Sequence, residues 1–217
     1  SNSVQALATN YTNISEAYEN YGFVYCFTNS IIDTGIAKPD DYSEESVKAV
    51  KDKLKKSKTK VKDKPNIIMI QLESFFDVDN VKGMSFSEDP LPVFHSLEEN
   101  YSSGLLTVPT VGAGTVNTEF EVLTGMRQHD FGVCEYPYKT VLKNTASESV
   151  CNNLSKLGYK SHAVHNNEAT FYGRNKVFSS LGFDSFTSKE YMNGITENPN
   201  GWSNDDIMSD EIIKTLD

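Results

Sequence analysis

The apolar run Ile67-Ile68-Met69-Ile70-Gln71-Leu72 constrains the fold of this chain more than any other feature. A strand that faces water on one side alternates apolar and polar residues, whereas this run is apolar at nearly every position. Such a pattern is typical of a central strand in a parallel sheet, where helices cover both faces. It therefore predicts an α/β domain that begins at Pro65.

Further strands and helices are expected to alternate along the rest of the chain. The segments 105–108 and 159–165 have the pattern of two more strands. Helices are expected from Pro92, between Thr145 and Gly158, over 174–181 and from Asp205 onward; Thr145 and Glu148 have the spacing of a capping box. This order predicts a mostly parallel sheet flanked by helices. A sheet with three clear strands also predicts exposed apolar surface or dimerisation.

Residues 1–64 predict a helical linker that precedes this domain. Asp41 and Glu44 have the spacing of a capping box at the start of a helix, and an apolar stripe supports that helix. The stripe consists of Val47, Val50 and Leu54. The basic run 51–64 indicates a solvated helix end, with a lipid-binding patch as the alternative.

The composition excludes some classes of function. The 217 residues carry a net charge of −10, so nucleic acid is a poor nonspecific partner because its phosphates would repel the chain. No apolar run approaches the roughly 20 residues that a membrane-spanning helix needs. Cys134 and Cys151 are either a disulfide or two free cysteines, since the sequence gives no geometry.

Two segments carry candidate catalytic residues. Glu73 follows directly after the first predicted strand, at the end where open α/β sheets bind ligands, so it is either a cap for the next element or a ligand for metal or substrate. Thr115 follows Gly112 and Gly114, which let the backbone turn sharply beside a ligand. At a helix N-terminus its hydroxyl is either an ordinary N-cap or, next to a cation, a nucleophile.

A third polar segment, His165 to Arg174, follows the strand expected over 159–165. It combines an imidazole, two amides, an aromatic ring and one of only two arginines in the chain. A guanidinium is the usual fork for a phosphate. The segment is therefore either a site that grips a phosphodiester and its head group or an ordinary polar loop.

Together these three segments resemble the lipoteichoic acid synthase and phosphoglycerol transferase family. Pro65–Phe75 resembles the family's opening strand and metal-site glutamate, Gly114–Phe120 resembles its nucleophile segment, and His165–Arg174 resembles its head-group loop. The resemblance extends over about Gly22 to Asp217. It implies a sulfatase- or alkaline phosphatase-like α/β fold that is truncated, with residues 65–217 as the N-terminal half of the catalytic domain.

The resemblance also implies roles for single residues and for partners. Thr115 would be the nucleophile, and Glu73 and Thr115 would be ligands of a divalent metal, Mn²⁺ foremost, with Mg²⁺ or Zn²⁺ as alternatives. The head group would be bound by His165, Asn167, Tyr172 and Arg174. The reaction would transfer glycerol phosphate from phosphatidylglycerol to a glycolipid or polymer acceptor of the cell envelope. It would take place outside a bacterial membrane, to which an N-terminal anchor beyond this chain tethers the domain.

The sequence departs from the family pattern at several positions. The family has aspartate where Asn167 stands and tryptophan where Tyr172 stands, which leaves the head group and the acceptor open. It also completes its metal site with a downstream aspartate–histidine pair, and none of His95, His129 and His162 has a matching context. We therefore expect this chain by itself to be inactive.

Three alternatives to glycerol phosphate transfer follow from the same residues. A sulfatase needs a cysteine or serine within C/S-x-P-x-R, and no such context surrounds Thr115. A phosphoethanolamine transferase shares the threonine chemistry. A noncatalytic glycolipid-binding domain on the same fold would account for the departures at Asn167 and Tyr172.

Overall fold

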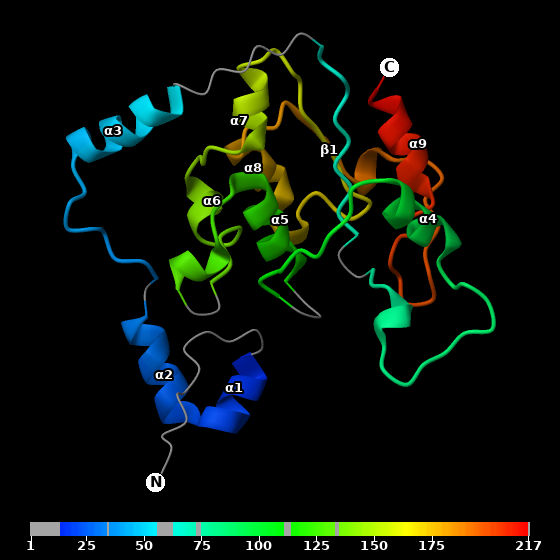
Figure 1. Ribbon diagram of the computed structural model, residues 1–217, viewed down its shortest axis with the longest axis horizontal. Helices are drawn as coiled ribbons and strands as arrows, with labels where there is room; N and C mark the ends of the chain where they lie inside the picture. Colours follow the sequence, from blue (N-terminus) through cyan, green and yellow to red (C-terminus); the bar gives the residue numbers. More distant parts are fainter. Residues whose placement is uncertain are drawn as a thin grey trace.

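The structure is a computed structural model that describes residues 14–33, 35–55, 63–72, 75–110, 114–132 and 135–216 (Figure 1). Its helices and strands are, in chain order, α1 (Ile14–Tyr21), α2 (Phe23–Ile32), α3 (Glu44–Lys55), α4 (Pro92–Asn100), α5 (Thr115–Thr124), α6 (Val141–Asn144), α7 (Val150–Ser155), β1 (His162–Val164), α8 (Arg174–Ser180), β2 (Ser185–Thr187) and α9 (Ile207–Lys214). Short 3-10 helices are η1 (Val78–Asn80), η2 (Gln128–Phe131), η3 (Phe171–Gly173) and η4 (Lys189–Tyr191). Four residues named above, Glu73, Gly112, Cys134 and Asp217, lie outside the described ranges.

A small parallel sheet connects the second half of the chain. β1 pairs with β2 in parallel, with Ala163 opposite Phe186. Parallel neighbours need a crossover connection, and here η3 and α8 supply it. The expectation of a parallel α/β arrangement is thus confirmed. β1 occupies the middle of the strand expected over 159–165, whereas β2 was not predicted.

The hydrophobic core lies between helices α5, α6 and α8. Its fully buried members are Val116, Phe120, Tyr138, Leu142, Ala163, Val177, Phe178 and Leu181. Burying a side chain such as Leu142 or Phe120 stabilises the fold by about 1.5–3 kcal/mol. Two of these residues, Val116 and Phe120, belong to α5, so the core fixes the position of the helix that begins with Thr115.

The prediction of strands in two segments is wrong, because neither segment pairs with another strand in the described residues. Residues 66–72 and 105–108 have no regular secondary structure, and their apolar side chains are exposed: Ile70 keeps 65% of its surface and Leu106 keeps 72%. Figure 1 shows the first of these segments as an extended trace. A strand is buried on both faces only where strands and helices pack around it, and no described residue pairs with either segment. The expectation of exposed apolar surface is confirmed.

Several helix ends differ from the sequence prediction although the helices exist. α3 is capped by Ser43 and Ser46, whose hydroxyl oxygens accept the backbone N–H groups of each other's residues, and not by the Asp41–Glu44 box. α7 is capped by Ser149 and Asn152, and not by Thr145 and Glu148. The helices expected from Pro92, over 174–181 and near the C-terminus are confirmed as α4, α8 and α9.

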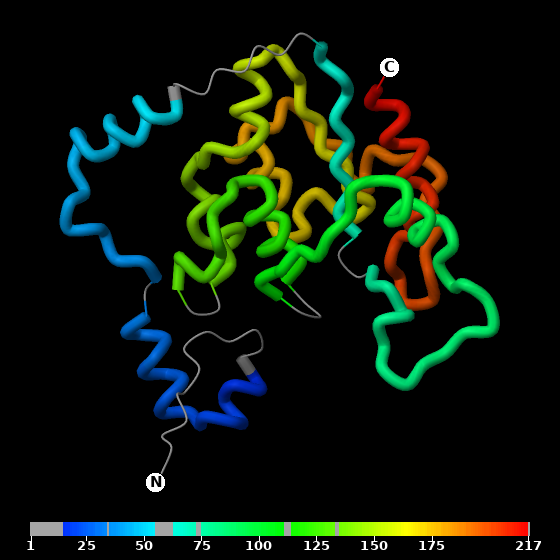
Figure 2. The backbone as a smooth tube through the Cα atoms, viewed as in Figure 1, coloured from blue at the N-terminus to red at the C-terminus, as the bar shows by residue number. Residues whose placement is uncertain are grey.

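The helices α1, α2 and α3 contribute none of their described residues to the main hydrophobic core. α1 packs on α2 around the buried Ala17 and Cys26, while the apolar stripe of α3 is exposed. Figure 2 shows all three (blue) on the side of the molecule away from α4 and α9. In the part of the chain described, no helix is both long and apolar enough to cross a bilayer. Cys151 is a buried free cysteine, as in the second of the two alternatives for it.

Candidate functional site

The N-terminus of α5 leaves the Thr115 hydroxyl without a capping role. Gly114 is the N-cap residue, with φ of 84° and no side chain to cap the helix, and Thr115 is the first helical residue. A left-handed φ favours glycine at this position. A Cβ at Gly114 would also lie 3.1 Å from both Thr110 Cγ2 and Tyr136 Oη, so there is little room for a side chain at this position. The ordinary N-cap interpretation of Thr115 is therefore wrong.

Thr115 lies half-buried beside the segment that precedes Glu73. The Gln71 side chain donates a hydrogen bond from Nε2 to the Thr115 carbonyl oxygen, at 3.3 Å. Among the described residues, no hydrogen bond involves the Thr115 hydroxyl itself. The described residues before Glu73 therefore reach the start of α5 at Gln71.

A largely buried ion pair joins α5 to the end of the loop 165–174. Arg174 is 1% exposed and donates to Glu119, with Nη2–Oε2 at 2.8 Å and Nε–Oε2 at 3.2 Å. Tyr138 completes the group because its hydroxyl donates to Glu119 Oε1 at 2.9 Å. Burial and then the Glu119 carboxylate raise the pKa of Tyr138, so this phenol keeps its proton and remains a donor.

The contacts of Arg174 therefore differ from those that the sequence pattern indicated. The pattern indicated a guanidinium that faces a phosphate, whereas in the structure Glu119 takes up its charge. Sequence reasoning missed Glu119 and Tyr138 as members of this group. Glu119 stands inside the nucleophile segment, but a carboxylate four residues into a helix carries no local signal for a partner in another loop.

His165 is held neutral with a defined tautomer. Its Nδ1 accepts the Asn167 backbone N–H at 3.0 Å, which leaves the proton on Nε2. Burial and then the charge of Arg174 lower the pKa of His165 to about 4, against a weaker opposite effect of Asp205. At neutral pH this imidazole can donate one hydrogen bond from Nε2 without bringing a charge.

The rest of the loop from 165 to 174 is tied down by its own polar groups. The Asn167 side-chain oxygen accepts the Glu168 N–H at 2.7 Å. Tyr172 has φ of 57°, the one positive φ of a non-glycine residue within the described ranges. Its ring packs edge-on against Phe171, and both rings lie under the Arg174 guanidinium at 5.5 and 5.7 Å. Backbone strain of this kind persists where the surroundings impose it, often at binding sites.

A second group of possible ligands lies away from Thr115, at η1 and α4. Ligand atoms of Asp77, Asp79 and His95 lie within 4.8 Å of one another, as a cation would require. His95 Nδ1 is 2.8 Å from Asp89 Oδ1. Partial dehydration alone would lower the pKa of His95, but the hydrogen bonds and charges of Asp77 and Asp89 outweigh it and raise that pKa. A protonated His95 among three carboxylates satisfies the same geometry without an ion.

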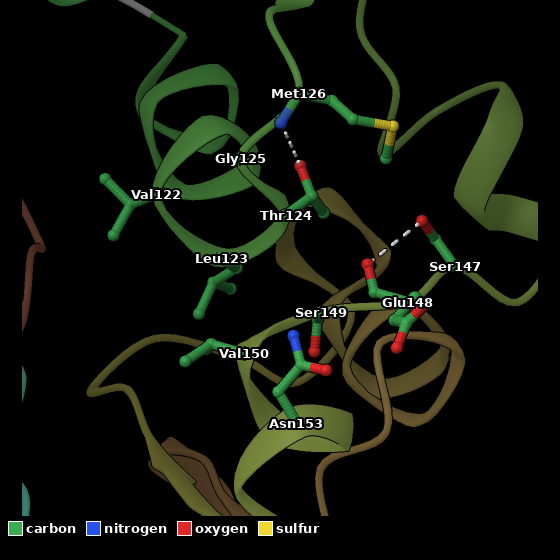
Figure 3. A pocket seen from close by; sticks show the side chains of 10 residues that line it. All are labelled: Val122, Leu123, Thr124, Gly125, Met126, Ser147, Glu148, Ser149, Val150 and Asn153. Atoms are coloured by element: carbon green, nitrogen blue, oxygen red, sulfur yellow. Dashed lines mark hydrogen bonds between the residues drawn. The ribbon is translucent and has the colours of Figure 1, made fainter. Parts of the chain in front are cut away.

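A hollow of about 470 Å³ opens at the other end of α5 (Figure 3). It lies between the C-terminus of α5 and the N-terminus of α7, where Met126 N–H donates to Thr124 Oγ1. Leu123, Val150 and Glu148 are among its lining residues. None of the candidate residues of the sequence lines it, so the hollow is separate from the Thr115 end of the helix.

Comparison of the sequence with known proteins identifies the family of this chain. The model of the sulfatase family matches residues 65–217, which is more than half of the chain. The chain therefore belongs to the sulfatase family, as the resemblance implied, and its helices with a small parallel sheet are a sulfatase-like α/β fold. Two relatives have names that refer to glucan modification and to capsular polysaccharide biosynthesis.

Two relatives come from Rhizobium meliloti (strain 1021). A protein whose name assigns it to cyclic beta-1,2-glucan modification is 27% identical over 203 residues, which cover 94% of this chain and 31% of the relative. The capsular polysaccharide biosynthesis protein RkpI is 32% identical over 130 residues, 57% of this chain and 22% of RkpI. The crystal structure of the lipoteichoic acid synthase LtaP from Listeria monocytogenes aligns with a TM-score of 0.42 and 20% identity, over 48% of this chain and 24% of LtaP. This chain thus spans about a third of these proteins or less.

Proposed function

We propose that this domain belongs to an enzyme that transfers glycerol phosphate from phosphatidylglycerol to a cell-envelope glycolipid or polymer through a covalent intermediate on Thr115. The observation that carries the proposal is the Thr115 hydroxyl, which begins α5 without serving as its cap. Helix N-terminal N–H groups favour an anion, so a phosphate can approach this hydroxyl. The names of the two bacterial relatives support a saccharide-bearing acceptor.

The chemistry would proceed in two displacements at one phosphorus atom. Thr115 Oγ1 gives up its proton and attacks the phosphodiester, the new O–P bond forms, and the bond to the diacylglycerol oxygen breaks as that oxygen takes up a proton. An acceptor hydroxyl then attacks the same phosphorus and gives up its proton. The Thr115 oxygen leaves and regains its own proton, so threonine is restored.

We propose that this end of α5 contributes ligands to a hard divalent cation, which the sulfatase family typically uses. The Thr115 hydroxyl is an oxygen donor with no other partner among the described residues, and Gln71 brings the segment before Glu73 to the same helix end. We propose Thr115 and Glu73 as its ligands, with Mn²⁺ foremost. When bound there, such an ion would ease deprotonation of the threonine and offset charge on the phosphate oxygens.

The loop 165–174 would hold the head group. His165 offers a neutral Nε2–H donor, and Asn167 and Tyr172 stand on the same loop. Arg174 fixes that loop to α5 through Glu119 and so positions the head group relative to Thr115. We propose that the reaction takes place at the outer face of a bacterial membrane.

The test is turnover by the full-length protein that carries this domain. Head-group-labelled phosphatidylglycerol is supplied in mixed micelles, and diacylglycerol release and the peptide adduct on Thr115 are measured by mass spectrometry. Thr115→Ala should abolish both signals, whereas Thr124→Ala, at the far end of the same helix, should leave both unchanged. Wild-type turnover in Thr115→Ala would end the proposal.

The same assay separates the alternatives. Phosphatidylethanolamine in place of phosphatidylglycerol identifies a phosphoethanolamine transferase if only that lipid is consumed. Saturable glycolipid binding without turnover of either lipid identifies a binding domain. Each of these two results contradicts glycerol phosphate transfer.

A further inference from the structure

Lys139 is held between two tyrosine rings. Its ammonium lies 4.8 Å from the centre of the Tyr136 ring and 5.4 Å from the centre of the Tyr172 ring. A turn closed by the Lys139 N–H and the Tyr136 carbonyl, at 2.8 Å, brings the lysine back over the first ring. Cation–π contacts of this kind orient an ammonium without neutralising it.

The charge of Lys139 is not taken up by a carboxylate. No ion pair links it to any acidic residue in the described parts of the chain, although Lys156, Lys160, Lys189 and Lys214 each have one. The acid four residues earlier, Glu135, is instead hydrogen-bonded to the Thr140 hydroxyl. Lys139 is exposed, so a fixed positive charge faces solvent in a chain of net charge −10.

The position of Lys139 connects the two halves of the proposed site. Tyr136, which carries the ammonium on its ring, packs with its hydroxyl against Gly114, the residue before Thr115. Tyr172, the second ring, is held at φ of 57° two residues before Arg174. Tyr138, which lies between Tyr136 and Lys139 in the sequence, donates a hydrogen bond to Glu119 in the interior. One turn of chain therefore supports the buried ion pair from inside and presents Lys139 outside.

The two basic side chains that belong to the loop 165–174 itself do not supply a free charge. Arg174 is buried and paired with Glu119, and His165 is neutral at physiological pH because burial and Arg174 lower its pKa to about 4. A phosphodiester anion that approaches Thr115 would be favoured by a cation on the side of the head-group loop, in addition to the proposed divalent ion, because the protein is acidic overall.

We propose that Lys139, with the rings of Tyr136 and Tyr172, forms the subsite that binds the phosphate anion of the substrate. This inference rests on the proposed function and deepens it by naming the group that receives the substrate's charge. The rings hold the ammonium in place, so little side-chain freedom is lost when the phosphate binds. An acceptor polymer that carries phosphate would be recognised by the same contact.

The experiment compares Lys139→Met, Lys139→Arg and Lys143→Met in the full-length protein. Lys143 is exposed on α6, four residues further along, and its variant removes the same charge. Lys139→Met should raise KM for phosphatidylglycerol at least about 10-fold, as loss of a hydrogen bond to a charged group does, with kcat little changed. Lys139→Arg should restore most of the affinity, and Lys143→Met should behave as wild type.

A second readout does not depend on turnover. Binding of glycerol phosphate to the same variants, followed by calorimetry, should weaken in Lys139→Met alone. If Thr115→Ala abolishes turnover but Lys139→Met keeps wild-type KM and binding, the subsite is wrong and the proposed function stands. If the wild-type protein consumes no lipid but Lys139→Met still weakens the binding of glycerol phosphate, the subsite stands and the proposed function fails. A lower melting temperature for Lys139→Met with unchanged binding would show a purely structural lysine and overturn the inference.

Discussion

Arg174 and Glu119 are 55 residues apart in the chain and form a buried ion pair with two nitrogen atoms of the guanidinium engaged. Arg174 begins α8 at the end of the head-group loop, and Glu119 lies one turn after Thr115 on α5. The pair therefore sets the distance between the two segments in which the sequence placed the nucleophile and the head-group residues.

Breaking this pair should destabilise the chain strongly. Arg174→Met leaves Glu119, whose side chain is 14% exposed, with only Tyr138 as a donor, and we expect a loss of up to about 3–5 kcal/mol in the free energy of unfolding. The double variant Arg174→Met/Glu119→Gln should lose less than the sum of the single variants, because it leaves no unpaired charge. Urea unfolding of the four proteins measures the coupling. Lys156→Met, which removes an exposed pair with Glu148, should change that free energy by less than about 1 kcal/mol. Additive single variants would show that the pair contributes no coupling.

The folded state should become less stable as pH falls through the range that His165 governs. Its pKa is about 4 in the fold and about 6.5 in an unfolded chain, so the unfolded state binds more protons between these values. Stability is therefore full above pH 6.5 and decreases toward pH 4, by up to about 3 kcal/mol. His165→Asn keeps an acceptor for the Asn167 N–H but cannot titrate. Unfolding measured from pH 7.5 to 4.5 should show a shallower loss in this variant, and equal slopes would contradict the prediction.

Gly114 should tolerate alanine less well than Gly125, the residue that ends the same helix. Both have positive φ, 84° and 71°, so each substitution costs about 1–2 kcal/mol of backbone strain. Only at Gly114 would the new Cβ also press on Thr110 and Tyr136, whereas Gly125 faces open space. We expect Gly114→Ala to lower the melting temperature more than Gly125→Ala does, with a further loss of turnover in the full-length protein. Equal shifts in melting temperature would mean that the loop relaxes without cost.

Two serine caps should differ in their contribution to global stability. Ser149 is buried, accepts the Cys151 N–H and donates to the Leu181 carbonyl at 2.5 Å. Ser149→Ala should therefore cost about 1–2 kcal/mol in global unfolding. Ser43→Ala removes an exposed cap of α3, whose apolar stripe is not buried. It should increase amide hydrogen exchange in α3 and leave the global transition in place. A cost from Ser43→Ala as large as that from Ser149→Ala would show that α3 unfolds together with the core.

The sequence by itself determined the features that depend on neighbouring residues. The positions of glycine and proline and the spacing of apolar residues located α4, α5, α8 and α9. Helix ends and amphipathic faces depend on only a few neighbouring positions, so local sequence is enough to predict them. Motif order indicated the sulfatase-like domain and directed attention to Thr115, at which α5 begins. The residue that caps a helix was less well predicted. Ser149, and not Thr145, caps α7, and its hydroxyl also donates to the carbonyl of Leu181, 32 residues away.

Only the tertiary structure decided which groups meet across the chain. The apolar run 67–72 expresses a preference for burial, but burial requires strands and helices on both sides, and within the described residues they are absent. The partner of Arg174 depended on the packing of α8 against α5 and α6, which no local pattern encodes. The same packing brought Lys139 over the Tyr172 ring, where no carboxylate of the described residues pairs with it. Local sequence fixes which residues can take part in a site, and long-range packing fixes which charges remain available to a substrate.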